Sequence, residues 1–75
     1  MEEKSRYTLR DLFNHLPISL AELARRSGVN EVTIARIRNG ESVALRSTAN
    51  KLLRVFSEVY NRPLTLDNVD FPVRG

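Results

Sequence analysis

The sequence contains no cysteine, no tryptophan, one histidine and only three glycines. The absence of cysteine excludes disulfide bonds and thiolate metal sites, and His15 alone cannot form a metal site. No apolar run reaches the roughly 20 residues that span a bilayer, and residues 1–8 lack the apolar centre of a secretion signal. A chain of 75 residues with none of these features is expected in the cytoplasm, with one small core held by helix packing or by pairing with a second copy.

The residue groups of an enzyme are missing as well. The sequence offers no acid–base pair, no nucleophile with a partner histidine and no glycine-rich loop that could hold a phosphate. We therefore expect no catalytic activity, no cofactor, no metal and no small-molecule substrate.

Positive charge is present, and it is concentrated in the middle of the chain. Residues 19–54 hold seven of the twelve Lys and Arg but only three of the nine Asp and Glu. Such a field attracts polyanions such as nucleic acid. On charge alone, a solvated helical surface rich in arginine explains the distribution equally well.

Apolar spacing and capping residues predict a mostly helical domain. A first helix is expected from Thr8, its cap, to Leu16, where Pro17 ends it. A second is expected to start at Ser19, with Glu22 completing a capping box, and to end at Gly28 in the left-handed conformation. His15 is expected on the surface.

The next helix is short, and it has apolar residues on one side only. Asn30 is expected to cap it, and Ile34 and Ile37 face the core, which leaves the opposite side open. Val43 and Leu45 are predicted to tether the loop that follows. The longest helix then begins at a cap of Ser47 or Thr48 and ends before Pro63.

Beyond Pro63, Leu64, Leu66 and Val69 suggest a further short helical turn, with Thr65 as its cap. Residues 67–75 form an extended tail that either covers the domain's own core, which we favour, or makes a dimer contact. Residues 1–7 are predicted to be a flexible arm in which Lys4 or Arg6 could touch a phosphate. The chain is thus one domain with a helical core over residues 8–66.

The two helices around Gly28 resemble the helix-turn-helix of the phage repressor and Cro family, also called the XRE family. The residues that carry the resemblance are Leu23, Ala24, Gly28, Val29, Ile34, Ile37, Asn39 and Gly40, with Thr48-Ala49 and Lys51-Leu52 in a fourth helix. The resemblance covers about residues 8–66. It implies an all-α, lambda-repressor-like bundle of four to five short helices that binds double-stranded DNA.

In that family the helix over about residues 30–39 enters the major groove, whose width accommodates an α-helix. The residues that the resemblance places against bases are Glu31, Val32, Thr33 and Arg36. Arg36 could make a bidentate contact with guanine O6 and N7. Glu31 either accepts from cytosine or serves only the helix dipole. Val32 either meets a thymine methyl group or packs on the core, and Thr33 bonds either a base edge or a phosphate.

A second group of residues is expected along the DNA backbone. They are Ser19, Asn30, Arg38, Asn39 and Arg46. Arg46 could instead enter a narrow minor groove, while Arg25 and Arg26 are more simply solvated. Many family members carry glutamine where this chain has Leu20, which either packs against the first helix or meets apolar atoms of the groove.

Two functions are consistent with these features. The first is sequence-specific binding of double-stranded DNA by a small transcriptional regulator, with repression expected and a homodimer on a palindromic site as one arrangement. The alternative is a protein-interaction module, or an antitoxin-like protein that binds a partner with the same fold. The outward arginines argue against the alternative, because protein interfaces favour an apolar centre.

Overall fold

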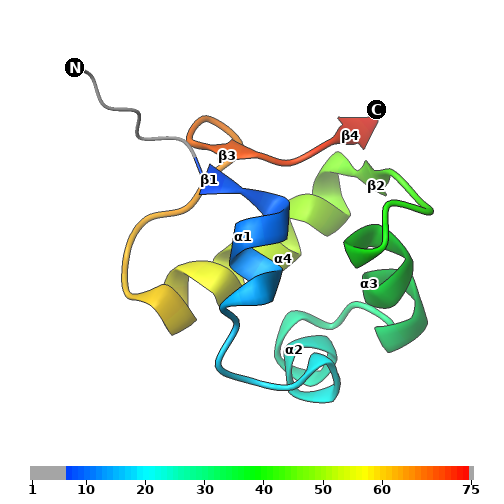
Figure 1. Cartoon of the computed structure of the whole chain (residues 1–75), viewed down its shortest axis with the longest axis horizontal. Helices are drawn as coiled ribbons and strands as arrows, with labels where there is room; N and C mark the ends of the chain where they lie inside the picture. The colour runs from blue at the N-terminus through cyan, green and yellow to red at the C-terminus, as the bar shows by residue number, and fades with distance from the viewer. Residues whose placement is uncertain (1–6, 75) are drawn as a thin grey trace.

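Four helices make up most of the computed structural model, which describes residues 7–74. In chain order the elements are β1 (Tyr7–Thr8), α1 (Leu9–Asn14), α2 (Leu20–Ser27), α3 (Glu31–Arg38), β2 (Ala44–Leu45), α4 (Arg46–Tyr60), β3 (Val69–Asp70) and β4 (Val73–Arg74). Figure 1 shows α1 in front of α4, with α2 and α3 below and beside them. The predicted helical bundle is confirmed, with four helices and four two-residue strands. Lys4 and Arg6 lie outside the described residues, and Tyr7 is paired in β1.

The first three helices begin at the side-chain caps that the sequence predicted. Thr8 Oγ1 accepts from the Asp11 amide at 3.1 Å, and Ser19 Oγ accepts from the Glu22 amide at 3.1 Å. Asn30 Oδ1 accepts from the Val32 amide at 2.8 Å. Each cap satisfies one of the free amides in the first turn of its helix.

Two predicted helix limits were wrong. Helix α1 ends at Asn14 rather than Leu16, because His15 leaves the helical conformation as its C-cap, two residues before Pro17. Helix α4 is capped by neither Ser47 nor Thr48. It begins at Arg46, after an extended Leu45 that makes no side-chain cap bond.

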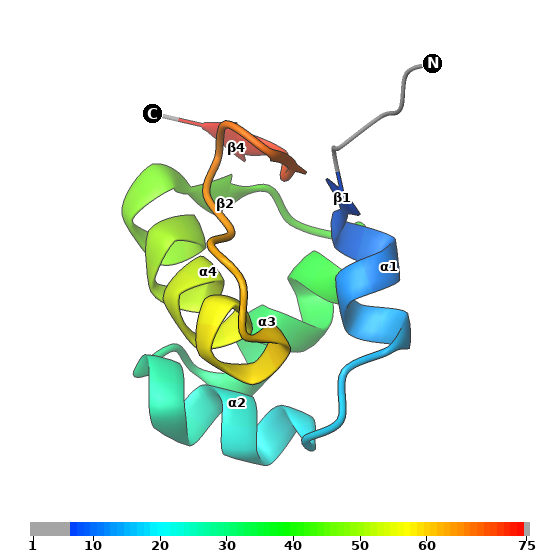
Figure 2. The ribbon, with the colours of Figure 1, turned by 90° about the vertical axis from the view of Figure 1, so that its left-hand side faces the viewer.

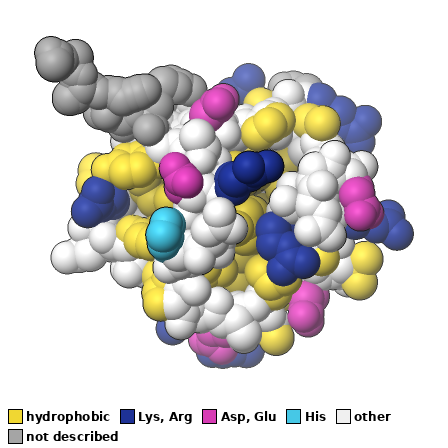
Figure 3. All heavy atoms as spheres, viewed as in Figure 1, with side chains coloured by type: hydrophobic (Ala, Val, Ile, Leu, Met, Phe, Trp, Pro, Cys, Tyr) yellow, Lys and Arg dark blue, Asp and Glu magenta, His cyan; other side chains and the backbone are white. Residues whose placement is uncertain are grey.

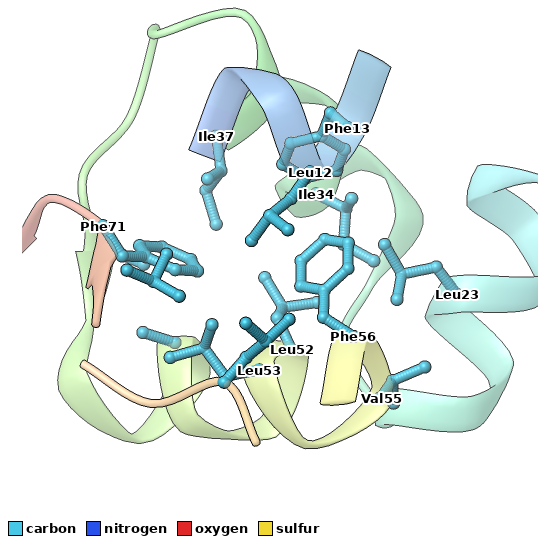
Figure 4. Close-up of a cluster of buried hydrophobic side chains, with 14 of the residues drawn as sticks. Leu12, Phe13, Leu23, Ile34, Ile37, Leu52, Leu53, Val55, Phe56 and Phe71 are labelled. Carbon is cyan, nitrogen blue, oxygen red and sulfur yellow. The ribbon is translucent and has the colours of Figure 1, made fainter. Parts of the chain in front are cut away.

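The core lies between α4 and the other three helices (Figure 4). Phe56 of α4 is fully buried, and its ring meets that of Phe13 edge-on at 5.4 Å. Its neighbour Val55 is also fully buried, as are Leu52 and Ala49. The core therefore takes up a broad side of α4.

The loop before α4 is anchored by a residue that the sequence analysis did not choose. Val43 and Leu45 were predicted to tether this loop, but they are 48% and 50% exposed, whereas Ala44 is buried. Ala44 and Leu45 form β2, and successive side chains of a strand point to opposite faces. Burial of Ala44 therefore turns both of its neighbours outward.

The C-terminal segment packs on the molecule to which it belongs. The helical turn expected after Pro63 is only a turn, in which Thr65 Oγ1 accepts from the Asp67 amide. Strand β3 then pairs with β1, and β4 pairs with β2, both in parallel. Val69 and Phe71 are buried in the core. The tail thus covers the domain's own core, as we favoured, and crosses one side of it in Figure 2.

Candidate nucleic-acid interface

The angle between α2 and α3 is fixed by the turn that joins them. Gly28 ends α2 in the left-handed conformation, with φ 78°, and its amide donates to the Ala24 carbonyl. The next residue, Val29, is buried, and its amide is bonded to Ser27 Oγ at 3.2 Å. Leu23 and Ile34 are fully buried on either side of this turn. The turn is thus closed by hydrogen bonds and anchored in the core, which holds the two helices as a unit.

One face of α3 is buried and the opposite face is open. Ile34 and Ile37 are buried, as predicted. Val32 and Arg36 lie four residues apart at the centre of the outward face, and Val32 is 59% exposed. This exposure removes the alternative in which Val32 packs on the core.

The other two predicted base-contacting residues flank this centre. Glu31 and Thr33 are both exposed, one on each side of Val32. The four exposed side chains therefore lie over residues 31–36 of α3.

The predicted backbone-binding residues lie around α3 rather than on it alone. Ser19 precedes α2, and Arg46 follows β2; in both Figure 1 and Figure 2, α3 lies between α2 and β2. Asn30 caps the start of α3, while Arg38 and Asn39 lie at its end, with Arg38 Nε bonded to Asn39 Oδ1 at 3.2 Å. All five residues are exposed. They thus lie before α2, at both ends of α3 and after β2.

The arginines differ in what already binds them. The Glu22 carboxylate, which was expected to complete a capping box, instead accepts from Arg25 and Arg26. Hydrogen bonds from Arg26 and then Arg25 lower the pKa of Glu22 below its ordinary value. By contrast, Arg36 and Arg46 form no ion pair with any residue of the described range 7–74. These two guanidinium groups are available to an external anion.

The surface around α3 is not uniformly positive. Figure 3 shows acidic side chains among the basic ones at the edge where Figure 1 places α3. Glu31 and Glu41, at the two ends of the helix, are both exposed. Fixed charges of both signs favour one register on a polyanion over others, because misplaced carboxylates are repelled by phosphates.

Leu20 departs from the usual family pattern. It is half-buried and packs against the core cluster. Its side chain therefore packs toward the interior of the bundle.

The best-formed cavity among the described residues lies away from this surface. A cavity of about 260 Å³ lies between α1 and the end of α4, and it is lined by Tyr7, Asp11, Leu12, His15, Tyr60, Arg62 and Leu64. None of these residues belongs to α2 or α3. No helix among the described residues is long and apolar enough to cross a membrane, and the described side chains form no group of three or more potential metal ligands.

These features define a class of protein. An exposed helix bearing free arginine, locked through a left-handed glycine to the helix before it and carried on a small helical bundle, is the arrangement of a helix-turn-helix DNA-binding domain. Comparison with family models agrees, since the helix-turn-helix model of the XRE type matches residues 9–63. The chain belongs to this helix-turn-helix family. No curated protein and no solved structure gives a significant match.

Proposed function

We propose that the chain is a sequence-specific transcriptional regulator, a repressor, that places α3 in the major groove of double-stranded DNA. The observation that carries the proposal is the outward face of α3. Its side chains are exposed although the helix is anchored from behind by Ile34 and Ile37. A rigid helix with free polar and apolar groups on its outer face can match the pattern of donors, acceptors and methyl groups in the groove.

The proposal gives each exposed side chain of α3 a role. Arg36 donates to guanine O6 and N7, and Val32 contacts a thymine methyl group. Thr33 bonds a base edge, and Glu31 accepts from cytosine N4. The arginine is the strongest of these contacts, because a bidentate pair discriminates against the wrong base by about 1–3 kcal/mol.

The residues around α3 hold the DNA backbone in this proposal. Ser19, Asn30, Arg38, Asn39 and Arg46 are exposed on both sides of the helix. Arg46 has no ion-pair partner among residues 7–74. Phosphate contacts of this kind fix register without selecting sequence.

We further propose that two copies bind a palindromic site. A single α3 can contact only a few base pairs, and two-fold operators with half-sites about 34 Å apart are usual for helix-turn-helix dimers. Val69 and Phe71 of the C-terminal tail are buried in their own domain, so these two side chains are not available for the dimer contact. Sedimentation of the protein with a half-site and with a full palindrome tests the two-copy arrangement. If the full palindrome binds only one copy, as the half-site does, the arrangement is contradicted.

Selection from a pool of random double-stranded DNA tests the proposal as a whole. We expect enrichment of one short motif, and lower expression of a reporter when that motif overlaps its promoter. A pool that remains random after repeated rounds would contradict sequence-specific binding. Unchanged or increased expression of the reporter would contradict repression while leaving DNA binding intact.

A further inference from the structure

The start of α4 is held differently from the start of the other three helices. Thr8, Ser19 and Asn30 cap α1, α2 and α3 with side-chain oxygens, whereas Leu45 before α4 makes no side-chain cap bond. Yet the backbone of Leu45, with φ −68° and ψ 153°, matches that of Ser19, with φ −73° and ψ 163°. The backbone at Leu45 thus has the geometry of a cap without the capping group.

A strand pairing lies at the same position. Leu45 belongs to β2, where Ala44 and Leu45 pair with Val73 and Arg74 of β4. Strand β4 also contacts α4 itself. The backbone that leads into α4 is therefore paired with a C-terminal segment that lies more than twenty-five residues further along the chain.

This C-terminal segment, residues 69–74, is itself firmly anchored, and we call it the strap. Val69 is 1% exposed and pairs with Tyr7 of β1, and Phe71 is 6% exposed. Figure 4 shows Phe71 entering the core at the end where Ile37 of α3 lies. The strap therefore packs into the core at the end where Ile37 lies, and its strand β4 pairs with the strand that leads into α4.

We propose that the strap is a positioning element for the DNA interface, and that β4 replaces the missing side-chain cap of α4. Arg46 is the first residue of α4 and follows the paired Leu45 directly. If the first turn of α4 frays, Arg46 loses its fixed position beside α3. The strap lies outside the matched residues 9–63, so this device belongs to the chain in addition to the family domain. The part that concerns affinity rests on the proposed function.

The experiment compares the full chain with a chain that ends at Pro72, which lacks β4 but keeps Val69 and Phe71. Amide hydrogen exchange over residues 49–52, whose amides donate to the carbonyls of residues 45–48 in the first turn of α4, and affinity for the selected DNA site are measured for both. We expect exchange in this turn to be about fivefold faster in the shortened chain, which is the size of effect that loss of one helix cap produces. Exchange in α2 and α3 stays unchanged, and the affinity for DNA falls by a similar factor.

Two further variants isolate the cause. Leu45→Ser in the shortened chain supplies a capping hydroxyl at a position whose backbone already has cap geometry, and it should restore both slow exchange and affinity. Arg74→Ala in the full chain removes the charge of the strap but keeps the pairing, and it should change exchange little.

Several results would overturn the inference. Unchanged exchange over residues 49–52 in the shortened chain would do so. Failure of Leu45→Ser to restore slow exchange would also do so, and this includes the case in which both shortened chains are unfolded. If Arg74→Ala reproduced the whole loss of affinity, Arg74 would be a direct contact instead. If the full chain binds no DNA, the proposed function fails, while the exchange measurements still decide whether β4 acts as a cap.

Discussion

At the scale of single residues, two pairs of arginines on and near α2 and α3 differ in whether a carboxylate already binds them. Arg25 and Arg26 are bound by Glu22 on α2, whereas Arg36 and Arg46 have no ion-pair partner within residues 7–74. An arginine that is already paired offers less to a phosphate or base, because binding must first replace an existing contact. Among the arginines near α3, Arg36 and Arg46 are therefore the ones whose loss should affect DNA binding.

Arg36→Ala is expected to weaken binding to the selected site by about 1–3 kcal/mol and to relax the preference at one base pair. The reason is loss of a bidentate contact from the centre of the outward face of α3. Fluorescence anisotropy with the selected site and its single-base variants measures both effects.

Arg54→Ala is the matched control, since it removes an exposed arginine from the middle of α4. It should leave the base preference intact. A uniform loss of affinity for all sequences in Arg36→Ala would make Arg36 a phosphate contact and would refute its assignment to a base.

Glu22 gives the domain a specific dependence on acid. Because Arg26 and Arg25 lower the pKa of Glu22 below its ordinary value of 4.5, the ionised carboxylate is favoured in the folded state. Its contribution to stability is present above pH 4.5 and is lost as the pH falls through the lower folded pKa.

The variant Glu22→Gln should therefore melt below the wild-type protein at neutral pH, and the gap should close as the pH falls below 4.5. Thermal melting followed by circular dichroism over this range measures the gap. The effect is small because the group is solvent-accessible. A gap that stays constant down to low pH would show that the carboxylate charge contributes nothing.

At the scale of elements, the turn between α2 and α3 requires glycine for its backbone conformation and not for space. Gly28 and Gly40 both have φ 78°, and an added Cβ at either would touch nothing within 4 Å. Substitution by alanine is then opposed only by the left-handed conformation, at about 1–2 kcal/mol.

We expect Gly28→Ala and Gly40→Ala to lower the free energy of unfolding by equal amounts, measured by urea denaturation. Gly28→Asn should cost less, because asparagine tolerates this region, as Asn61 does at the end of α4. A much larger loss for Gly28→Ala would mean that the turn packs more tightly than its open surroundings indicate.

Local signals in the sequence predicted the elements well. The caps Thr8, Ser19 and Asn30 and the left-handed Gly28 each act within four residues, so a short window of sequence contains all their partners. The same holds for Ile34 and Ile37, whose spacing alone places them on one side of a helix. This is why the helix pair and its outward face were predictable.

The start of α4 was not predictable from such signals. Ser47 and Thr48 have capping side chains, but the backbone at Leu45 is set by β4. A pairing between segments this far apart leaves no local pattern, and two-residue strands show too few alternating positions to be recognised. For the same reason the burial of Ala44 in place of its larger neighbours could not be foreseen.

At the scale of the whole molecule, the proposed interface lies at one edge of the bundle. Helix α3 lies at that edge in Figure 1, between α2 and β2, and the described cavity lies elsewhere, between α1 and the end of α4. A helix at an exposed edge with charged neighbours suits a groove in a polyanion better than it suits a small ligand, which requires a concave site. The central claim is therefore that this surface binds DNA through phosphate contacts around α3.

The dependence of affinity on salt tests that claim most directly. Contact with about four to six phosphates per domain predicts a slope near −4 to −5 when the logarithm of the association constant for the selected site is plotted against the logarithm of salt concentration. A flat response would contradict the account and would favour the alternative, a domain that binds another protein with the same fold.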